Sequence, residues 1–189
     1  MRISVVIPRY LYAVEQVLPE ELFNSIQAQD WPSRPYTRLT IGWGRRRRIN
    51  HDPVQDTAVN DYCYNQLKTT IEHECGLQFT DTQQSSFQYW LDEPGFRPAM
   101  HTDGDLASAV QIYLWSNGRS DLGTAFYHSQ DPHTVLHTFD SRPNTGYIMF
   151  NQPEAERPML WHDMTQAVPP DLVRLCLYVT FGCYQRVQC

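Results

Sequence analysis

Two histidines and one aspartate in this sequence have the types and spacing of a metal site. His101, Thr102 and Asp103 are consecutive, and side chains along a β-strand alternate between its two faces, so the first and third would point the same way. His162 on a later strand would add a second imidazole. Two imidazoles and one carboxylate form the facial triad that leaves open positions on ferrous iron. We therefore predict a metal site made of His101, Asp103 and His162.

Asp105 is a second carboxylate that could fill the acidic position of this site. It has the same parity as Asp103 in the sequence. Along a continuous strand, however, it would lie about 13 Å from His101, whereas Asp103 would lie about 7 Å away. The shorter separation favours Asp103 as the ligand.

Arg174 stands at the start of a long apolar run that ends at Phe181. An arginine that points inward from such a strand is costly unless its guanidinium group is paired. Its planar fork matches a carboxylate with two parallel hydrogen bonds, which suits the far end of a dicarboxylate co-substrate. A surface arginine or an internal salt bridge are the alternatives that the residues leave open.

The elements that must position these residues change in character along the chain. Residues 15–28 and 57–75 have apolar side chains at helical spacing, and Gly76 is placed to end the second helix. A strand is expected at 36–43. From residue 77 onward, short β-branched and aromatic runs between turn residues are typical of an antiparallel sandwich or barrel. The expected strands cover residues 86–91, 99–102, 107–115, 124–128, 134–139, 146–150, 159–162 and 173–181.

Eight strands are the number that a double-sheet jelly roll needs. The 189 residues, 41% of them hydrophobic, suit a single domain, with helical support in 1–76 and a jelly-roll core in 77–184. A net charge of −6 argues against a main role in nucleic-acid binding. Five cysteines without a C-x-x-C pair, and an apolar N-terminal run that stops at Pro8, predict a cytoplasmic protein without a signal peptide or membrane span.

These residues together resemble the iron(II)/2-oxoglutarate-dependent oxygenase superfamily, whose pattern is H-x-D, a distal H, and R-x-S. His101 and Asp103 match the first motif, His162 the distal histidine, and Arg174 the arginine. Cys176 replaces the serine or threonine that usually adds a hydrogen bond to the co-substrate, and a thiol is a weaker donor. Tyr113 on a core strand could supply the missing hydroxyl.

The resemblance implies a mainly β, α+β fold with a double-stranded β-helix core of the jelly-roll, cupin-like type, supported by N-terminal helices. It also implies Fe(II) bound by the triad and 2-oxoglutarate bound by Arg174, Cys176 and Tyr113. The expected reaction uses O2 to hydroxylate an unactivated C–H bond of a small molecule or peptidyl side chain, with release of succinate and CO2.

Two alternatives to this function remain open. The same iron site could demethylate nucleic acid oxidatively, with Arg45–Arg48 gripping phosphates, although the acidic composition argues against it. A cupin-like domain could also bind metal and an organic acid without turnover.

Other polar clusters carry weaker predictions. Arg45–Arg48 is expected to form a solvated loop. His133 and His137 would share a helix face, but the β-rich context and Pro132 favour a loop and strand over a second metal site. Trp161 precedes the predicted metal ligand His162 and could form part of the wall of the active-site pocket.

Overall fold

The computed structural model describes residues 1–38, 43–80, 85–103, 107–151 and 160–187. The helical segments are α1 (Glu20–Gln27), the 3-10 turn η1 (Trp31–Ser33), α2 (Thr57–Asp61), the π-helical segment η2 (Tyr62–Leu67) and α3 (Lys68–Cys75). The strands are β1 (Arg2–Ile7), β2 (Leu11–Glu15), β3 (Tyr36–Arg38), β4 (Arg46–Ile49), β5 (Leu77–Phe79), β6 (Ser86–Asp92), β7 (Ser108–Trp115), β8 (Thr124–Tyr127), β9 (Val135–Phe139), β10 (Thr145–Phe150), β11 (Trp161–Met164), β12 (Arg174–Phe181) and β13 (Tyr184–Arg186).

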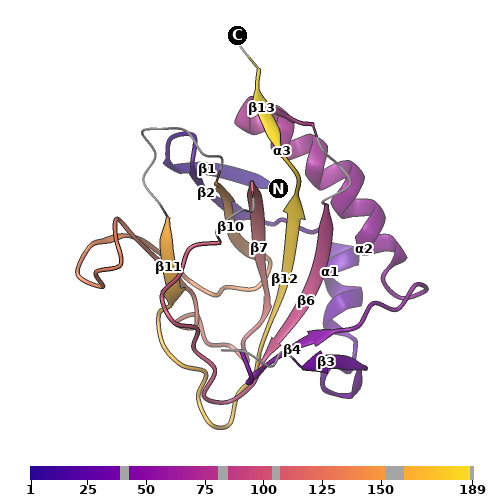
Figure 1. Ribbon diagram of the computed structural model, residues 1–189. Coiled ribbons are helices and arrows are strands. Elements are labelled where there is room, and N and C mark those ends of the chain that lie inside the picture. Colours follow the sequence, from indigo (N-terminus) through magenta and orange to yellow (C-terminus); the bar gives the residue numbers. More distant parts are fainter. Residues whose placement is uncertain (39–42, 81–84, 104–106, 152–159, 188–189) are drawn as a thin grey trace.

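Most strands belong to one large antiparallel sheet, in the order β1-β2-β10-β7-β12-β6-β4-β3. A three-stranded sheet, β11-β8-β9, and the pair β13-β5 complete the β-structure of the described residues. Figure 1 shows the helices on one side of the large sheet and β11 on the other. The predicted α+β, mainly β fold of the jelly-roll type, with helical support from the first part of the chain, is confirmed.

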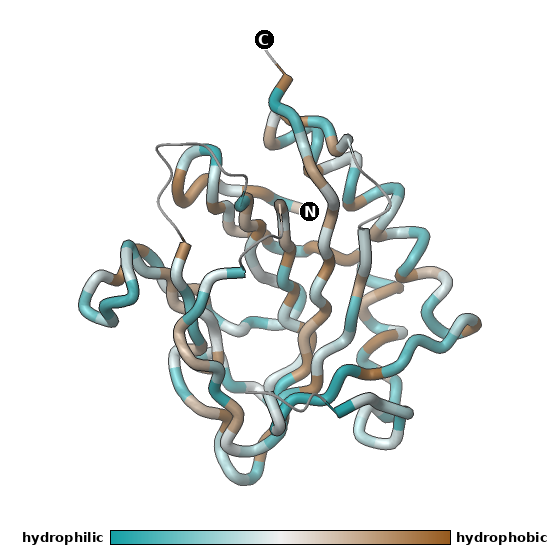
Figure 2. The backbone as a smooth tube through the Cα atoms, in the orientation of Figure 1, coloured by the Kyte–Doolittle hydropathy of each residue, from teal (hydrophilic) through white to brown (hydrophobic). Residues whose placement is uncertain are grey.

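The central strands of the large sheet are buried on both faces, and each face has its own chemistry. On β12, alternate residues from Leu175 to Phe181 pack with helix residues in the main hydrophobic core. Arg174, Cys176 and Tyr178 point to the opposite face, toward the three-stranded sheet. Strands covered on both sides read as nearly continuous apolar runs, and Figure 2 shows β7 and β12 as mostly hydrophobic. The fold thus places one face of these strands against the helices and leaves the other for a site.

The helix predicted over 57–75 forms as three consecutive segments, α2, η2 and α3. Gly76 ends it in the left-handed conformation, with φ of 62°, as its position predicted. The helix expected in 15–28 is shorter, because Glu15 ends β2 and residues 16–19 form an irregular connection before α1. The β1–β2 hairpin was not predicted, since its partner β10 lies far along the chain.

Two predicted segments are corrected by the structure. Residues 99–102 form no regular strand, and His101 makes only an isolated bridge to His162. Arg45–Arg48 is not a solvated loop, because residues from Arg46 onward form β4, which pairs with β6. Of the strand expected at 36–43, β3 covers the first three residues, and 39–42 lie outside the described residues. Across the part of the chain that is described, each helix is too short or too polar to cross a bilayer.

Gly146 on β10 provides a test of how closely the sheet is packed. A Cβ at this position would lie 1.8 Å from the backbone oxygen of Gln111 on β7. Gly146→Ala should therefore lower the free energy of unfolding by about 1–3 kcal/mol or more, measured by urea denaturation. Gly44→Ala is the control, because a Cβ there meets nothing within 4 Å. Equal stability of the two variants would contradict the register of β10 against β7.

Candidate metal centre

The structure brings His101, Asp103 and His162 to one point between the two sheets. One ligand atom from each residue lies within 4.8 Å of the others. Asp103 Oδ1 is 3.6 Å from His101 Nε2 and 3.5 Å from His162 Nε2. The two histidines are paired by backbone hydrogen bonds in both directions, with N···O distances of 3.0 and 2.8 Å. This pairing sets the imidazoles side by side, with ring centroids 4.4 Å apart.

Backbone carbonyls fix which nitrogen of each imidazole faces the site. His101 Nδ1 lies 2.8 Å from Ala99 O, and His162 Nδ1 lies 3.1 Å from Leu160 O. A carbonyl oxygen only accepts, so each Nδ1 carries a hydrogen, and in the neutral ring Nε2 keeps its lone pair. Metal-binding histidines are commonly oriented in this way. Burial lowers the pKa of His162, but Asp103 outweighs this effect and raises it, so the site attracts a positive charge. A divalent metal ion would replace the proton on His162 Nε2, and the donor set of two imidazole nitrogens and one carboxylate oxygen fits such an ion.

Tyr178 on β12 holds the carboxylate of Asp103. Its hydroxyl donates to Oδ2 at 2.5 Å, which leaves Oδ1 facing the two imidazoles. Burial raises the pKa of Asp103, but His162, the Tyr178 hydroxyl and His101 outweigh that effect and lower it to about 2. Burial and the neighbouring His162 lower the pKa of His101. At neutral pH the carboxylate is therefore ionised and His101 neutral, as metal ligands must be.

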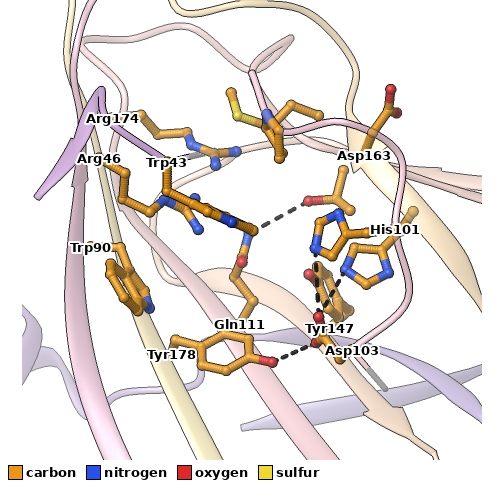
Figure 3. Close-up of a pocket in the computed structure, with 14 residues that line it drawn as sticks. Trp43, Arg46, Trp90, His101, Asp103, Gln111, Tyr147, Asp163, Arg174 and Tyr178 are labelled. Atoms are coloured by element: carbon orange, nitrogen blue, oxygen red, sulfur yellow. Dashed lines mark hydrogen bonds and ion pairs between the residues drawn. The ribbon is translucent and has the colours of Figure 1, made fainter. Parts of the chain in front are cut away.

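The triad opens into a cavity of about 210 Å³ (Figure 3). Its walls come from both sheets and from the segment before β4. Arg174 and Arg46 line it on the side away from Asp103. Other lining residues are Trp43, Trp90, Pro98, Gln111, Thr124, Tyr147, Asp163, Met164 and Tyr178. The cavity therefore joins a metal-binding side to a cationic side, and four aromatic side chains form part of the walls between them.

Arg174 is buried and lines this cavity, and its role in binding an anion stays a prediction. It also takes part in an internal salt bridge, the alternative that the sequence left open. Its Nε and Nη2 lie 2.8 and 2.6 Å from Asp92 Oδ2, and its Nη1 donates to Leu122 O at 2.6 Å. Burial lowers the pKa of Arg174, but Cys176 and Asp92 outweigh this and raise it, so the group stays charged.

Tyr113 and Cys176 are buried beside Arg174 but are not among the described residues that line the cavity. The Tyr113 hydroxyl donates to Thr124 Oγ1 at 2.8 Å, and Thr124 itself lines the cavity. Burial raises the pKa of the Cys176 thiol to about 11, despite the opposing effect of Arg174. Their predicted contact with a co-substrate therefore remains a prediction. Thr124, which accepts the hydrogen bond from Tyr113, is the member of this pair that lines the cavity.

The structure differs from the sequence prediction in how His101 and Asp103 are brought together and in the role of Arg46. His101 and Asp103 come together through a loop after an isolated bridge, and not through strand alternation. Asp105, the rejected ligand, lies outside the described residues. The sequence reasoning also missed Arg46, which pairs with Asp92 and lines the cavity. The available signal for Asp92 was its parity with Ser86 and Gln88 along β6.

The remaining candidate residues lie elsewhere. His133 sits in an exposed loop and His137 on β9, as the loop-and-strand interpretation predicted. Among the described residues, the triad is the only group of three side chains placed to share a metal ion. Trp161 is not one of the lining residues identified in the described chain, and Trp43 and Trp90 provide the indole walls instead.

No family model matches the sequence, and no curated protein matches it. The fold, however, is similar to solved structures. SnoN, a non-heme alpha-ketoglutarate-dependent epimerase from nogalamycin biosynthesis, matches with a TM-score of 0.67 and 11% identity over 95% of this chain and 80% of that chain. A Pseudomonas putida prolyl-4-hydroxylase matches with a TM-score of 0.62 and 16% identity over 91% and 92%. An oxidoreductase of the 2OG-Fe(II) oxygenase family from Burkholderia pseudomallei gives 0.62 and 13% over 94% and 87%.

These comparisons show a shared fold, and the resemblance to 2-oxoglutarate/iron(II) oxygenases found in the sequence is confirmed at that level. A second structure of SnoN is a complex with Fe3+, alpha-ketoglutarate and nogalamycin RO. The structures that share this fold include an epimerase and a prolyl-4-hydroxylase, so the fold alone does not determine the reaction.

Metal binding to the triad can be tested without any substrate. Nickel(II) at about 100 times its dissociation constant should stabilise the wild-type fold by about 2.7 kcal/mol, because it binds only the folded site. His162→Ala should lose this stabilisation, measured as the metal-dependent rise in melting temperature. His133→Ala, in an exposed loop, is the matched control and should respond like the wild type. A His162→Ala protein that nickel still stabilises fully would exclude the triad as the site.

Tyr178→Phe isolates the hydrogen bond to Asp103 while keeping the aromatic ring. Removing a partner that orients a metal ligand costs about 10–100-fold in metal affinity. We expect a loss in this range for nickel(II), measured by calorimetry. Tyr113→Phe is the control, because its hydroxyl donates to Thr124 and not to a ligand. If both variants bind nickel equally well, the orientation of Asp103 does not depend on Tyr178.

Proposed function

We propose that this chain is an iron(II)- and 2-oxoglutarate-dependent oxygenase that hydroxylates an unactivated C–H bond of a small molecule or a peptidyl side chain. The observation that carries the proposal is the convergence of His101 Nε2, His162 Nε2 and Asp103 Oδ1 in a fold shared with such oxygenases. Three protein ligands on one side of a ferrous ion leave its other positions open for an organic acid and dioxygen.

The residues divide the work between the two sides of the cavity. His101, Asp103 and His162 would hold the iron, and the carbonyls of Ala99 and Leu160 keep both Nε2 atoms directed at it. The iron supplies the oxygen activation that couples decarboxylation of 2-oxoglutarate, to succinate and CO2, to oxidation of the substrate. Arg174 would bind the carboxylate at the far end of the 2-oxo acid.

The walls of the cavity orient the reactants and keep bulk water out. Trp43 lies edge-on to His101, with ring centroids 5.3 Å apart, and so covers one side of the metal position. Gln111 and Thr124 on the floor are joined by a hydrogen bond of 3.5 Å and offer polar contacts between the two ends. Water exclusion limits unproductive oxidation in such a site.

The proposed substrate class rests on the similar solved structures. SnoN is solved with nogalamycin RO, and the Pseudomonas putida protein is a prolyl-4-hydroxylase, so both a small molecule and a peptidyl side chain are compatible with this fold. SnoN is an epimerase. Product analysis must therefore follow any activity, because oxidation of a C–H bond can end in hydroxylation or in another outcome.

The structure argues against the nucleic-acid alternative. Arg45–Arg48 is not a free basic patch: Arg46 is buried on Asp92, Arg47 Nε donates to Glu93 at 2.7 Å, and Arg45 Nη1 donates to Pro94 O at 2.8 Å. Phosphate binding needs cations that are free to neutralise the backbone. The non-catalytic alternative retains the same site and is distinguished by turnover alone.

Succinate release tests the proposed activity directly. With Fe(II), 2-oxoglutarate and O2, the wild-type protein should form succinate at least slowly without added substrate. His101→Ala and Asp103→Ala should abolish this while keeping the circular-dichroism spectrum, because both residues line a cavity and not the core. His133→Ala should keep the wild-type rate. Full succinate formation by either triad variant would exclude the proposed centre, and none by the wild type under any screened substrate would favour a binding domain.

A further inference from the structure

Three charged side chains form a row across neighbouring strands at the cationic side of the cavity. Arg46 on β4 and Arg174 on β12 are both in register with Asp92 on β6, which lies between them. Asp92 is fully buried. Arg46 Nε and Nη2 lie 2.5 and 3.0 Å from its two oxygens, while Arg174 Nε and Nη2 both lie close to Oδ2. One carboxylate therefore serves two guanidinium groups.

The charges in this row do not balance. Two arginines and one aspartate leave one net positive charge, held where Arg174 is 1% and Arg46 8% exposed. A buried excess charge is costly unless an opposite charge is supplied. Both guanidinium groups line the cavity, so the missing anion has access from that side. The row of Arg46, Asp92 and Arg174 would therefore be neutralised by one further carboxylate in the cavity.

Hydrogen-bond donors remain for that carboxylate. Each guanidinium group has five N–H donors. Arg46 Nη1 has no hydrogen-bond partner among the described residues, and Arg174 Nη1 and Nη2 use one donor each on Leu122 O and Asp92. Figure 3 shows the two guanidinium groups close together on the side of the cavity opposite Asp103.

Aromatic rings hold Arg46 in this position. Its guanidinium carbon lies 4.4 Å from the ring centre of Phe96, 5.0 Å from that of Trp43 and 5.3 Å from that of Trp90. Contacts of this kind favour the cation and exclude water from it. Because less water screens the charge, its interaction with an anion in the cavity is strengthened.

We propose that Arg46 is a second recognition residue for the far carboxylate of the 2-oxo acid, and that it supplies the net positive charge there. Asp92 neutralises the charge of one arginine, so Arg174 and Asp92 alone would form a neutral pair. Arg46 restores one positive charge, and Asp92 positions both guanidinium groups through the strand register. This inference rests on the proposed function, since the carboxylate is that of 2-oxoglutarate.

The test measures binding of 2-oxoglutarate to nickel(II)-loaded protein by calorimetry, with no turnover. Arg46→Gln should weaken binding roughly 30-fold or more, the scale of losing one charged partner in a buried site. Arg46→Lys keeps the charge and should recover part of the loss. The double variant Arg46→Gln/Asp92→Asn leaves Arg174 as a single uncompensated cation and should recover most of the affinity. Arg48→Gln, an exposed residue on the same strand, is the control for overall charge.

A second ligand separates charge recognition from cavity shape. The compound 2-oxopentanoate has a methyl group in place of the far carboxylate, so Arg46→Gln should not change its affinity. Wild-type affinity of Arg46→Gln for 2-oxoglutarate would overturn the inference, as would a double variant no better than the single one, or an equal loss for both ligands. Failure of the wild-type protein to bind 2-oxoglutarate at all would instead overturn the proposed function, and this inference with it.

Discussion

The paired backbone hydrogen bonds between His101 and His162 are the constraint on which the site depends. They join the segment after β6 to the start of β11, two parts of the chain that are far apart in sequence. Residues directly opposite in an antiparallel pair have side chains on the same face. Both imidazoles therefore project from the same bridge. Asp103 follows His101 by two residues, which is close enough for its carboxylate to contact both rings. An isolated bridge therefore positions His101, where the sequence had predicted a regular strand over 99–102.

The large sheet supports this bridge. One of its faces packs in the hydrophobic core, and the other carries the polar residues of the site. Toward the helices, β7 and β12 present aliphatic residues that form the main core. Toward the small sheet, the same strands present Gln111, Arg174 and Tyr178. Several buried polar groups there are paired with one another: Arg174 is bonded to Asp92, and Tyr178 to Asp103. Polar groups satisfied in this way are held in place, which is what a site needs for fixed geometry.

The sequence was sufficient to predict the fold class and to bring together the triad, because ligand types and strand-like runs are local signals. The sequence did not predict that Arg46 lines the cavity or that Asp92 pairs with two arginines. Four consecutive arginines resemble a solvated run by composition, and only the pairing of β4 with β6 turns Arg46 inward and Arg47 toward Glu93. Register is set by long-range packing and not by local pattern. The same limit explains the unpredicted β1–β2 hairpin, whose place is fixed by β10.

Charge balance links the two sides of the cavity. A divalent metal with neutral imidazoles and ionised Asp103 has one net positive charge, and the row of Arg46, Asp92 and Arg174 has another. A 2-oxo dicarboxylate has two negative charges, one at each end, so the filled cavity would be neutral as a whole and at each side. With Arg174 and Asp92 alone, the far carboxylate would be buried without a counter-charge, which is strongly unfavourable. Because Asp92 neutralises Arg174, a second arginine is needed to balance the far carboxylate. Arg46 and Asp92 therefore depend on each other, and a substitution of one changes the effect of the other.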